Sequence, residues 1–292
     1  GVTGVAAGTA NISYTVTNAC GSAFVFKAIT VNIAPGAISG SSISCVGASN
    51  SLTCSPGGGT WASSNTAAAT IGSSSGSVTG VGTGTTTISY TLSDGCFSTM
   101  PVTVNAPPAA ITGSLNVCVG GTTALTDGGG GTWTSGTTSV ATVGSLTGLV
   151  NAIAPGTSVI TYAVGGCSVT ATVTVAANPA AITPATPVSI CVGATASLGD
   201  VTPAGTWSTS SAGVATVSGT GLVTGVTAGS ATISYTVSGC SSIKTVTVLT
   251  TPVALSPASA SVCVGLTVTF TDGVPGGTWS SSFPLIATIS SG

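Results

Sequence analysis

The chain is a tandem repeat with a period of about 73 residues. A period of this length exceeds that of helical solenoids and propeller blades, and it is typical of small complete domains in series. A Cys-Val-Gly tripeptide, all four tryptophans and all four tyrosines recur at fixed places in the repeat, and we interpret these aromatic residues as core anchors. They are Cys45, Cys118, Cys191 and Cys263, then Trp61, Trp133, Trp207 and Trp279, and Tyr14, Tyr90, Tyr162 and Tyr235.

Proline-containing linkers predict the domain boundaries, because proline stiffens a joint and removes a backbone donor. The linkers lie near Pro35, Pro107, Pro179 and Pro252. We predict three complete repeats, at residues 34–104, 105–176 and 177–249. Residues 1–33 are the C-terminal half of a repeat, and residues 250–292 are the N-terminal half of another.

The pattern within a repeat is that of short strands. In the repeat 105–176, apolar and polar residues alternate over residues 117–126, glycines 128–131 form a turn, and Gly165-Gly166 forms a tight hairpin. No segment has a helical periodicity. About seven short strands per repeat, with regular turns, predict an all-β fold of tandem β-sandwiches.

The near absence of charge excludes several functions. Only 2% of residues are charged: Lys27, Lys244, Asp94, Asp127, Asp200 and Asp272, with no histidine. Nucleic-acid binding needs a basic patch, and acid–base catalysis needs histidine or paired carboxylates. We therefore expect no enzyme, no cofactor and no nucleic-acid partner. No apolar run approaches about 20 residues, so we expect no membrane insertion in this stretch.

The aspartates have a structural interpretation. Asp127, Asp200 and Asp272 each follow a strand, where a side chain that caps a turn is expected. Calcium needs six to eight oxygen ligands, so an isolated aspartate argues against a calcium site.

The nine cysteines indicate disulfides. Three repeats hold a recurring pair, which predicts one intradomain bond per repeat and an oxidising compartment. The predicted bonds are Cys45–Cys96, Cys118–Cys167 and Cys191–Cys240. A metal site would need four cysteine or histidine ligands, and two cysteines per repeat do not supply them. Cys54 replaces the turn aspartate of the other repeats, as either a free thiol or a link between chains.

Three motifs carry a resemblance to a known family. Gly-Thr-Trp-Ser around Trp279, Val-Ala-Thr-Val at residues 214–217, and the run from Gly221 to Tyr235 resemble the bacterial immunoglobulin-like (Ig-like) domain, group 2. That family is similar to the invasin and intimin repeats. The resemblance implies secreted Ig-like sandwiches at a bacterial cell surface, which serve as stalk, spacer or adhesin. The cysteine pair departs from the general family pattern and suggests a disulfide-stapled subgroup.

Both ends of the sequence fall inside a repeat. Residues 1–8 align with residues 222–229, and residues 286–289 align with residues 214–217. Residues 250–292 together with residues 1–33 of a next copy would make one whole domain, with Cys263 bonded to Cys20 of that copy. One very long chain and strand complementation between subunits are both routes to this arrangement.

The predicted function is structural. We expect an extracellular filament or bacterial surface stalk whose partner is itself, either as a head-to-tail homopolymer or as a continuous repeat chain. The alternative is an adhesin or carbohydrate-binding array, with surface glycans as partners. A spacer attached to a secreted enzyme is a third hypothesis.

Overall fold

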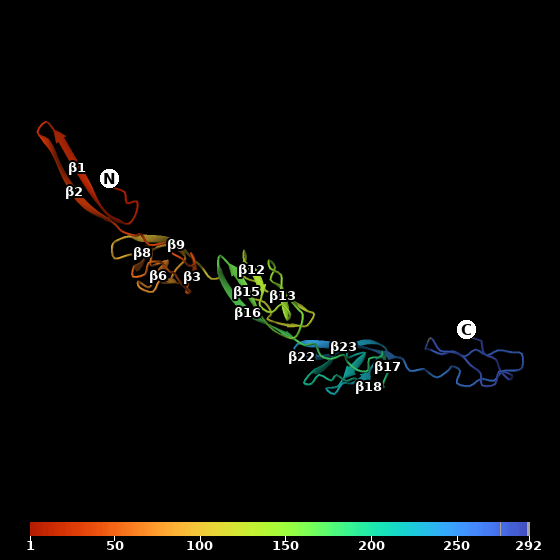
Figure 1. Ribbon diagram of the computed structural model, residues 1–292. Coiled ribbons are helices and arrows are strands. Elements are labelled where there is room, and N and C mark those ends of the chain that lie inside the picture. Colours follow the sequence, from red (N-terminus) through yellow and green to blue (C-terminus); the bar gives the residue numbers. More distant parts are fainter. Residues whose placement is uncertain (275, 291–292) are drawn as a thin grey trace. The chain divides into compact units, whose positions relative to one another are not determined.

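The computed structural model describes residues 1–274 and 276–290, and within them it consists of strands and loops (Figure 1). The chain divides into two compact units: residues 1–115, 122–153 and 157–174, and residues 116–121, 154–156 and 175–292. Over the described ranges, no helix is long and apolar enough to cross a membrane.

Three successive stretches contain the same seven strands. The first has β3 (Ile43–Cys45), β4 (Ser49–Ser51), β5 (Thr60–Ser63), β6 (Ala69–Ile71), β7 (Ser77–Gly80), β8 (Gly84–Thr91) and β9 (Phe97–Asn105). The second has β10 (Asn116–Cys118), β11 (Thr122–Ala124), β12 (Thr132–Ser135), β13 (Ala141–Val143), β14 (Leu149–Ala152), β15 (Gly156–Val164) and β16 (Cys167–Ala176). The third has β17 (Val188–Cys191), β18 (Thr195–Ser197), β19 (Thr206–Thr209), β20 (Ala215–Val217), β21 (Leu222–Gly225), β22 (Gly229–Val237) and β23 (Cys240–Leu249).

Each set of seven strands forms a four-stranded and a three-stranded sheet. The four-stranded sheets have the orders β3-β9-β8-β5, β10-β16-β15-β12 and β17-β23-β22-β19. The three-stranded sheets have the orders β4-β7-β6, β11-β14-β13 and β18-β21-β20. This confirms the predicted all-β fold of tandem Ig-like sandwiches with seven short strands each.

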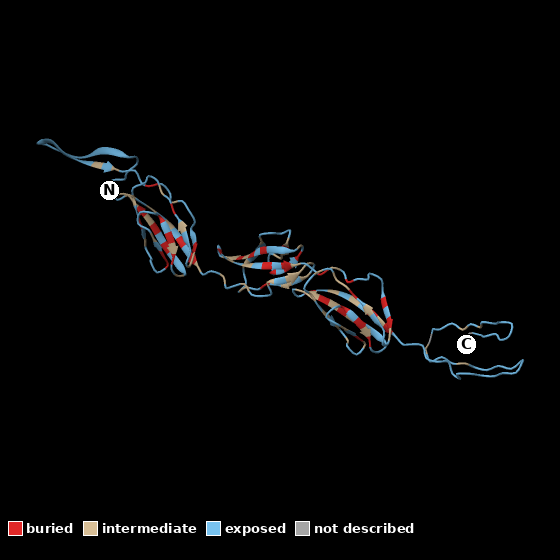
Figure 2. Ribbon diagram, turned by 90° about the horizontal axis from the view of Figure 1, so that it is seen from below, coloured by how far each residue is buried: buried red, intermediate tan, exposed pale blue. Residues whose placement is uncertain are grey.

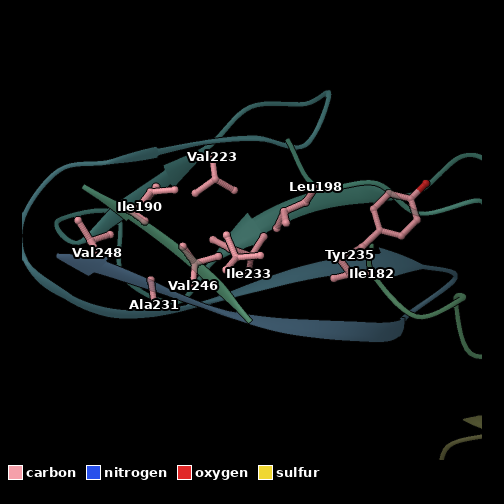
Figure 3. Packing of buried hydrophobic residues seen from close by; sticks show 11 residues of the cluster. Ile182, Ile190, Leu198, Val223, Ala231, Ile233, Tyr235, Val246 and Val248 are labelled. Atoms are coloured by element: carbon pink, nitrogen blue, oxygen red, sulfur yellow. The ribbon is translucent and has the colours of Figure 1, made fainter. Parts of the chain in front are cut away.

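The strands form because β-branched residues alternate with small polar residues. In β22, Ala231, Ile233 and Tyr235 point into the core and are at most 7% exposed, whereas residues between them are threonine and serine. Val246 and Val248 of β23 join them, and Val223 comes from the other sheet (Figure 3). The same alternation gives the striped burial visible along the strands in Figure 2.

A tryptophan–tyrosine pair closes one end of each core. The ring centroids of Trp207 and Tyr235 are 4.8 Å apart, and those of the pairs Trp61–Tyr90 and Trp133–Tyr162 are 4.6 Å apart. Trp61, Trp133, Tyr90, Tyr162 and Tyr235 are buried, and Trp207 is half-buried against the core. These residues occupy the core positions that the sequence assigned to them in the complete repeats.

A glycine two residues before each tryptophan holds the tyrosine. The Gly205 N–H donates to Tyr235 Oη at 2.9 Å, and the Tyr235 hydroxyl donates to the Thr202 carbonyl at 2.6 Å. A Cβ on Gly205 would lie 2.2 Å from Tyr235 Cζ, so no other residue fits without moving the ring. Gly59 and Gly131 approach Tyr90 and Tyr162 in the same way.

The two ends of the chain differ from the complete repeats. β1 (Gly8–Asn18) and β2 (Gly21–Val31) form a two-stranded sheet of their own. Residues 250–274 and 276–290 contain no named strand, only the isolated bridge between Ser256 and Thr271. Residues 291 and 292, which end the predicted half-repeat 250–292, lie outside the described residues.

We predict that Gly205→Ala destabilises the third repeat by about 1–3 kcal/mol, because its methyl group overpacks against the Tyr235 ring. Gly213→Ala is the matched control, since a Cβ there meets no atom within 4 Å. Urea denaturation followed by Trp207 fluorescence measures the difference. An equal midpoint for the two variants would show that the ring does not need this glycine.

Candidate functional site: cross-repeat disulfides and an open hairpin

The disulfides join neighbouring repeats rather than the two sheets of one repeat. Cys45 is bonded to Cys167 and Cys118 to Cys240, with Cα–Cα distances of 5.8 and 5.6 Å and a sequence separation of 122 residues in each case. In both bonds, the Cys-Val-Gly cysteine of one repeat reaches the hairpin cysteine of the following repeat. The bonds lie within one compact unit each.

The predicted intradomain pairs are therefore wrong. Cys45–Cys96 and Cys118–Cys167 are replaced by the cross-repeat bonds, and Cys191 is free because Cys240 is bonded to Cys118. The prediction of one disulfide inside each repeat fails with them.

The strand topology explains this error. β3 runs parallel to β9, which places Cys45 beside Asn105 at the last residue of β9. Cys96 immediately precedes Phe97, the first residue of that strand. At about 3.3 Å per residue, the two cysteines lie roughly 30 Å apart. A disulfide tolerates a Cα–Cα distance of at most about 7 Å, so the bond inside the repeat cannot form.

The third repeat repeats this geometry. Cys191 pairs with Leu249 at the end of β23, whereas Cys240 begins that strand. Each of these repeats therefore carries its two cysteines at opposite ends of the sandwich, too far apart to bond to each other. The sequence contained a signal for the cross-repeat bonds, because Cys45–Cys167 and Cys118–Cys240 both have a separation of 122 residues, whereas the intradomain pairs have separations of 51, 49 and 49 residues.

Glycine makes the close approach at the first cross-repeat bond possible. Gly165 and Gly166 form the turn before Cys167 with φ angles of 58° and 80°, which favour glycine. A Cβ on Gly166 would lie 2.9 Å from Ile43 Cγ2 of the preceding repeat. Asn105 Nδ2 donates to the Gly165 carbonyl at 2.6 Å beside the bond. The hairpin tip is thus fitted to the preceding repeat by contact as well as by the disulfide.

Five cysteines are free in the structure: Cys20, Cys54, Cys96, Cys191 and Cys263. The Cys54 thiol donates to the Gly36 carbonyl oxygen at 3.2 Å. Cys96 lies in a turn where its N–H donates to Asp94 Oδ1 at 3.0 Å. Burial, and secondly the negative charge of Asp94, raise the pKa of the Cys96 thiol.

The hairpin β1–β2 has the sequence of a sandwich core but is not buried. Alignment of Gly8 with Gly229 places Tyr14 at the position of Tyr235. Tyr14 is 70% exposed, whereas Tyr235 is 7% exposed. Among the eight predicted anchors, Tyr14 is the one that is exposed rather than buried or half-buried. Its equivalent strand β22 pairs with β19, and β23 pairs with β17, whereas β1 and β2 pair only with each other.

Residues 250–290 contain the complementary sequence without the sheet. Gly277 and Trp279 occupy the positions of Gly205 and Trp207, and Trp279 is half-buried. Residues 278–281 and 260–263, the equivalents of β19 and β17, are not in strands. Val264 and Leu285 are fully exposed. Within the described residues, Gly277 and Trp279 therefore have no tyrosine ring beside them. Tyr14 in turn lacks the glycine and the tryptophan that contact Tyr235 in the third repeat.

The remaining candidate residues form turns. Asp200 Oδ1 accepts the Thr202 N–H at 2.7 Å, Asp272 Oδ1 accepts the Val274 N–H at 3.1 Å, and Asp127 Oδ1 accepts the Gly128 N–H. Among the described residues, no group of three or more His, Cys, Asp or Glu side chains could hold a metal. The geometry of these aspartates is that of turn capping.

Comparison with known proteins agrees with the family resemblance. Residues 172–248 match the family model described as bacterial Ig-like domain (group 2). This match includes two of the three motifs that carry the resemblance, at residues 214–217 and 221–235. No curated protein matches.

Several solved structures are similar to the chain. The surface layer protein SbsC, domains 1–6, is 17% identical over 85% of this chain and 45% of that chain, with a TM-score of 0.24. The bacterial integrin-binding protein invasin is 14% identical over 79% of this chain and 68% of that chain, with a TM-score of 0.35. The chain thus spans less than half of the SbsC structure.

Cleavage of the linker between the first two complete repeats tests the disulfide pattern. We predict that a protease site inserted between Ala109 and Ala110 can be cut without releasing the two fragments in denaturant, because Cys45–Cys167 spans the cut. Reduction separates them. The matched variant Cys45→Ser releases both fragments without reductant. Release from the chain with all nine cysteines would show that Cys45 is bonded elsewhere.

The thiol of Cys96 should be slow to react at neutral pH. A raised pKa leaves less thiolate, the form that attacks alkylating reagents. Asp94→Asn removes the negative charge that is the second cause of the raised pKa. We therefore expect the alkylation rate of Cys96 to increase with pH in both proteins, but to begin its increase at a lower pH in the variant than in the unmodified chain. Mass spectrometry of the Cys96 peptide across pH 7–10 measures this, with the Cys20 peptide of the same sample as a control. Superimposable Cys96 profiles would contradict a role for Asp94.

Proposed function

We propose that this protein is a structural component of an extracellular filament or surface stalk in bacteria, assembled from copies of itself. In the assembly, the β1–β2 hairpin of one copy completes residues 250–292 of another. The observation that carries the proposal is the exposure of Tyr14, 70%, against 3%, 2% and 7% for Tyr90, Tyr162 and Tyr235. In the described parts of the two ends, neither Tyr14 nor Trp279 is buried.

The complete repeats supply the template for this contact. In the third repeat, β22 and β23 lie between β19 and β17 in one sheet. By equivalence, β1 would pair with residues 278–281 and β2 with residues 260–263 of the other copy. Both free edges of the hairpin would then be hydrogen-bonded, which is the usual result of strand addition.

The side chains fit the same template. Trp207 lies directly opposite Tyr235 in the paired strands, so Trp279 would lie opposite Tyr14 of the other copy. Ile12 and Val16, now 42% and 46% exposed, share the face of Tyr14 and would enter the core with it. Full burial of an aliphatic or aromatic side chain of this size contributes about 1.5–3 kcal/mol. Several such residues on each side support a stable junction.

The composition supports assembly into filaments. A chain with 2% charged residues has little electrostatic self-repulsion to keep copies apart. Head-to-tail contacts that do not close into a ring produce open filaments. Cross-repeat disulfides suit an oxidising compartment outside the cytoplasm, and the match to a bacterial Ig-like domain is compatible with the cell surface. The proposed role is therefore structural and not catalytic.

Substitution of Tyr14 tests the proposed function. Tyr14→Ala removes the ring that would pack beside Trp279, and we expect assembly to weaken by roughly 100-fold or more, since truncating a buried aromatic side chain to alanine costs about 3–5 kcal/mol. Phe26→Ala is the matched control. Phe26 lies on the opposite face of the same hairpin, and its equivalent Ile243 stays 66% exposed in a complete repeat.

Light scattering against concentration, with electron microscopy of the same samples, measures assembly. We expect filaments from the unmodified chain and from Phe26→Ala, and a large increase in the critical concentration for Tyr14→Ala. Gly277→Val, which places a side chain where the Tyr14 ring would lie, should have the same effect from the other side of the junction. Equal assembly by all four proteins would overturn the proposal.

A further inference from the structure

We propose that two disulfides lock each junction between copies: Cys191 to Cys20 of the next copy, and Cys263 to Cys96 of the next copy. This inference rests on the proposed function, because it requires the hairpin of one copy to complete the end of another. It extends across the junction the bonding pattern that Cys45–Cys167 and Cys118–Cys240 establish inside the chain.

Cys191 is placed as the bonded Cys-Val-Gly cysteines are. It ends β17 beside Leu249, the last residue of β23, just as Cys45 ends β3 beside Asn105, the last residue of β9. Both are half-buried. Cys45 is bonded to the cysteine at the hairpin of the following repeat. By analogy, Cys191 would bond to the hairpin cysteine of the repeat that follows it. That repeat is the one formed at the junction, and its hairpin is β1–β2 of the next copy.

Cys20 is the hairpin cysteine of that junction repeat. It lies in the turn between Asn18 and Gly21, the residues that end β1 and begin β2. The equivalent cysteines Cys167 and Cys240 also lie at hairpin tips, directly after Gly166 and Gly239. Cys20 is exposed and free in the structure, so it is accessible to a partner.

The same geometry argues against the predicted bond from Cys263 to Cys20 of the next copy. By equivalence with Cys191 and Leu249, Cys263 would lie beside Asn32, just past the end of β2. Cys20 lies beyond the opposite end of β2, roughly 40 Å away at the rise of a strand. This distance is several times the reach of a disulfide.

By the same pattern, the partner of Cys263 would lie at the hairpin of the repeat that follows the junction. That hairpin connects β8 and β9 of the next copy, and its cysteine is Cys96, which is free and half-buried. With the second bond in place, each of the eight repeat cysteines has one partner. Cys54, which has no equivalent in the other repeats, is the ninth and remains a thiol.

The bond-forming step is thiol–disulfide exchange with a small-molecule disulfide such as oxidised glutathione. The thiolate of one cysteine attacks a sulfur of the oxidant, forms a mixed disulfide and releases one glutathione thiolate. The second cysteine, as thiolate, attacks the protein sulfur and releases the other. Two protein thiols are oxidised to one disulfide, the oxidant is reduced to two thiols, and the two protons pass to them. Because the pKa of the Cys96 thiol is raised, we expect the bond to Cys263 to form more slowly.

An isotope-mixing experiment tests the inference. Equal amounts of ¹⁴N and ¹⁵N chain are purified in reductant, mixed, allowed to assemble, oxidised with glutathione disulfide and digested without reduction. Mass spectrometry then identifies the linked peptides. We expect Cys191–Cys20 and Cys263–Cys96 in all isotope combinations, about half of them mixed, because each joins two copies. Cys45–Cys167 and Cys118–Cys240 serve as internal controls and should show no mixed pairs.

Denaturing electrophoresis of variants provides the second measurement. Without reductant, we expect a ladder of covalent multimers from the unmodified chain and from the control Cys54→Ser. The double variant Cys191→Ser with Cys263→Ser should still form filaments but migrate as single chains.

The outcomes separate the two proposals. Filaments with Cys20 and Cys96 still reduced, or with Cys20 bonded to Cys263, would overturn the disulfide inference and leave the proposed function standing. Unmixed Cys191–Cys20 pairs would also overturn it. If the reduced chain forms no filaments under any condition, the proposed function fails, and the junction disulfides fail with it.

Discussion

The parallel pairing of the first and last strands of each repeat is the constraint from which the disulfide pattern follows. Because β3 runs beside the end of β9, the Cys-Val-Gly cysteine lies at the end of the sandwich where the chain leaves for the next repeat. The hairpin cysteine lies at the opposite end. Neither can reach the other, and the two bonds that form, Cys45–Cys167 and Cys118–Cys240, join neighbouring repeats. A small domain with a modest core thus gains its covalent support from the next domain.

The tryptophan–tyrosine pair also explains why the two ends of the chain differ from the complete repeats. In a complete repeat, a glycine N–H and a backbone carbonyl hold the tyrosine hydroxyl while the two rings pack 4.6–4.8 Å apart. This arrangement needs strands from both halves of the repeat. In residues 1–33 and 250–292 the halves are separate, so the tyrosine is exposed and the glycine has no ring beside it. The same contact that completes a domain can therefore join two copies.

The near absence of charged residues affects how one repeat recognises another. Such a surface has few ion pairs to hold a register or repel a neighbour, so shape, strand pairing and disulfides carry the specificity. The outward faces of β22 and β23 are mostly serine and threonine, which are soluble without charge. In the proposed junction, pairing of equivalent strands and cysteines would distinguish a correct contact from a nonspecific one.

The sequence by itself determined the repeat, the seven-stranded all-β sandwiches and the aromatic core, because periodicity and alternation are local properties that each residue carries. It also marked Tyr14 and Trp279 as members of incomplete repeats. The tertiary structure decided which cysteines meet, since the Cys-Val-Gly cysteine recurs at a similar spacing from the hairpin cysteine of its own repeat and from that of the following repeat, and recurrence alone does not choose between them. Only the direction of β3 relative to β9 separates Cys45 from Cys96 by the length of a strand and leaves the hairpin of the following repeat within reach.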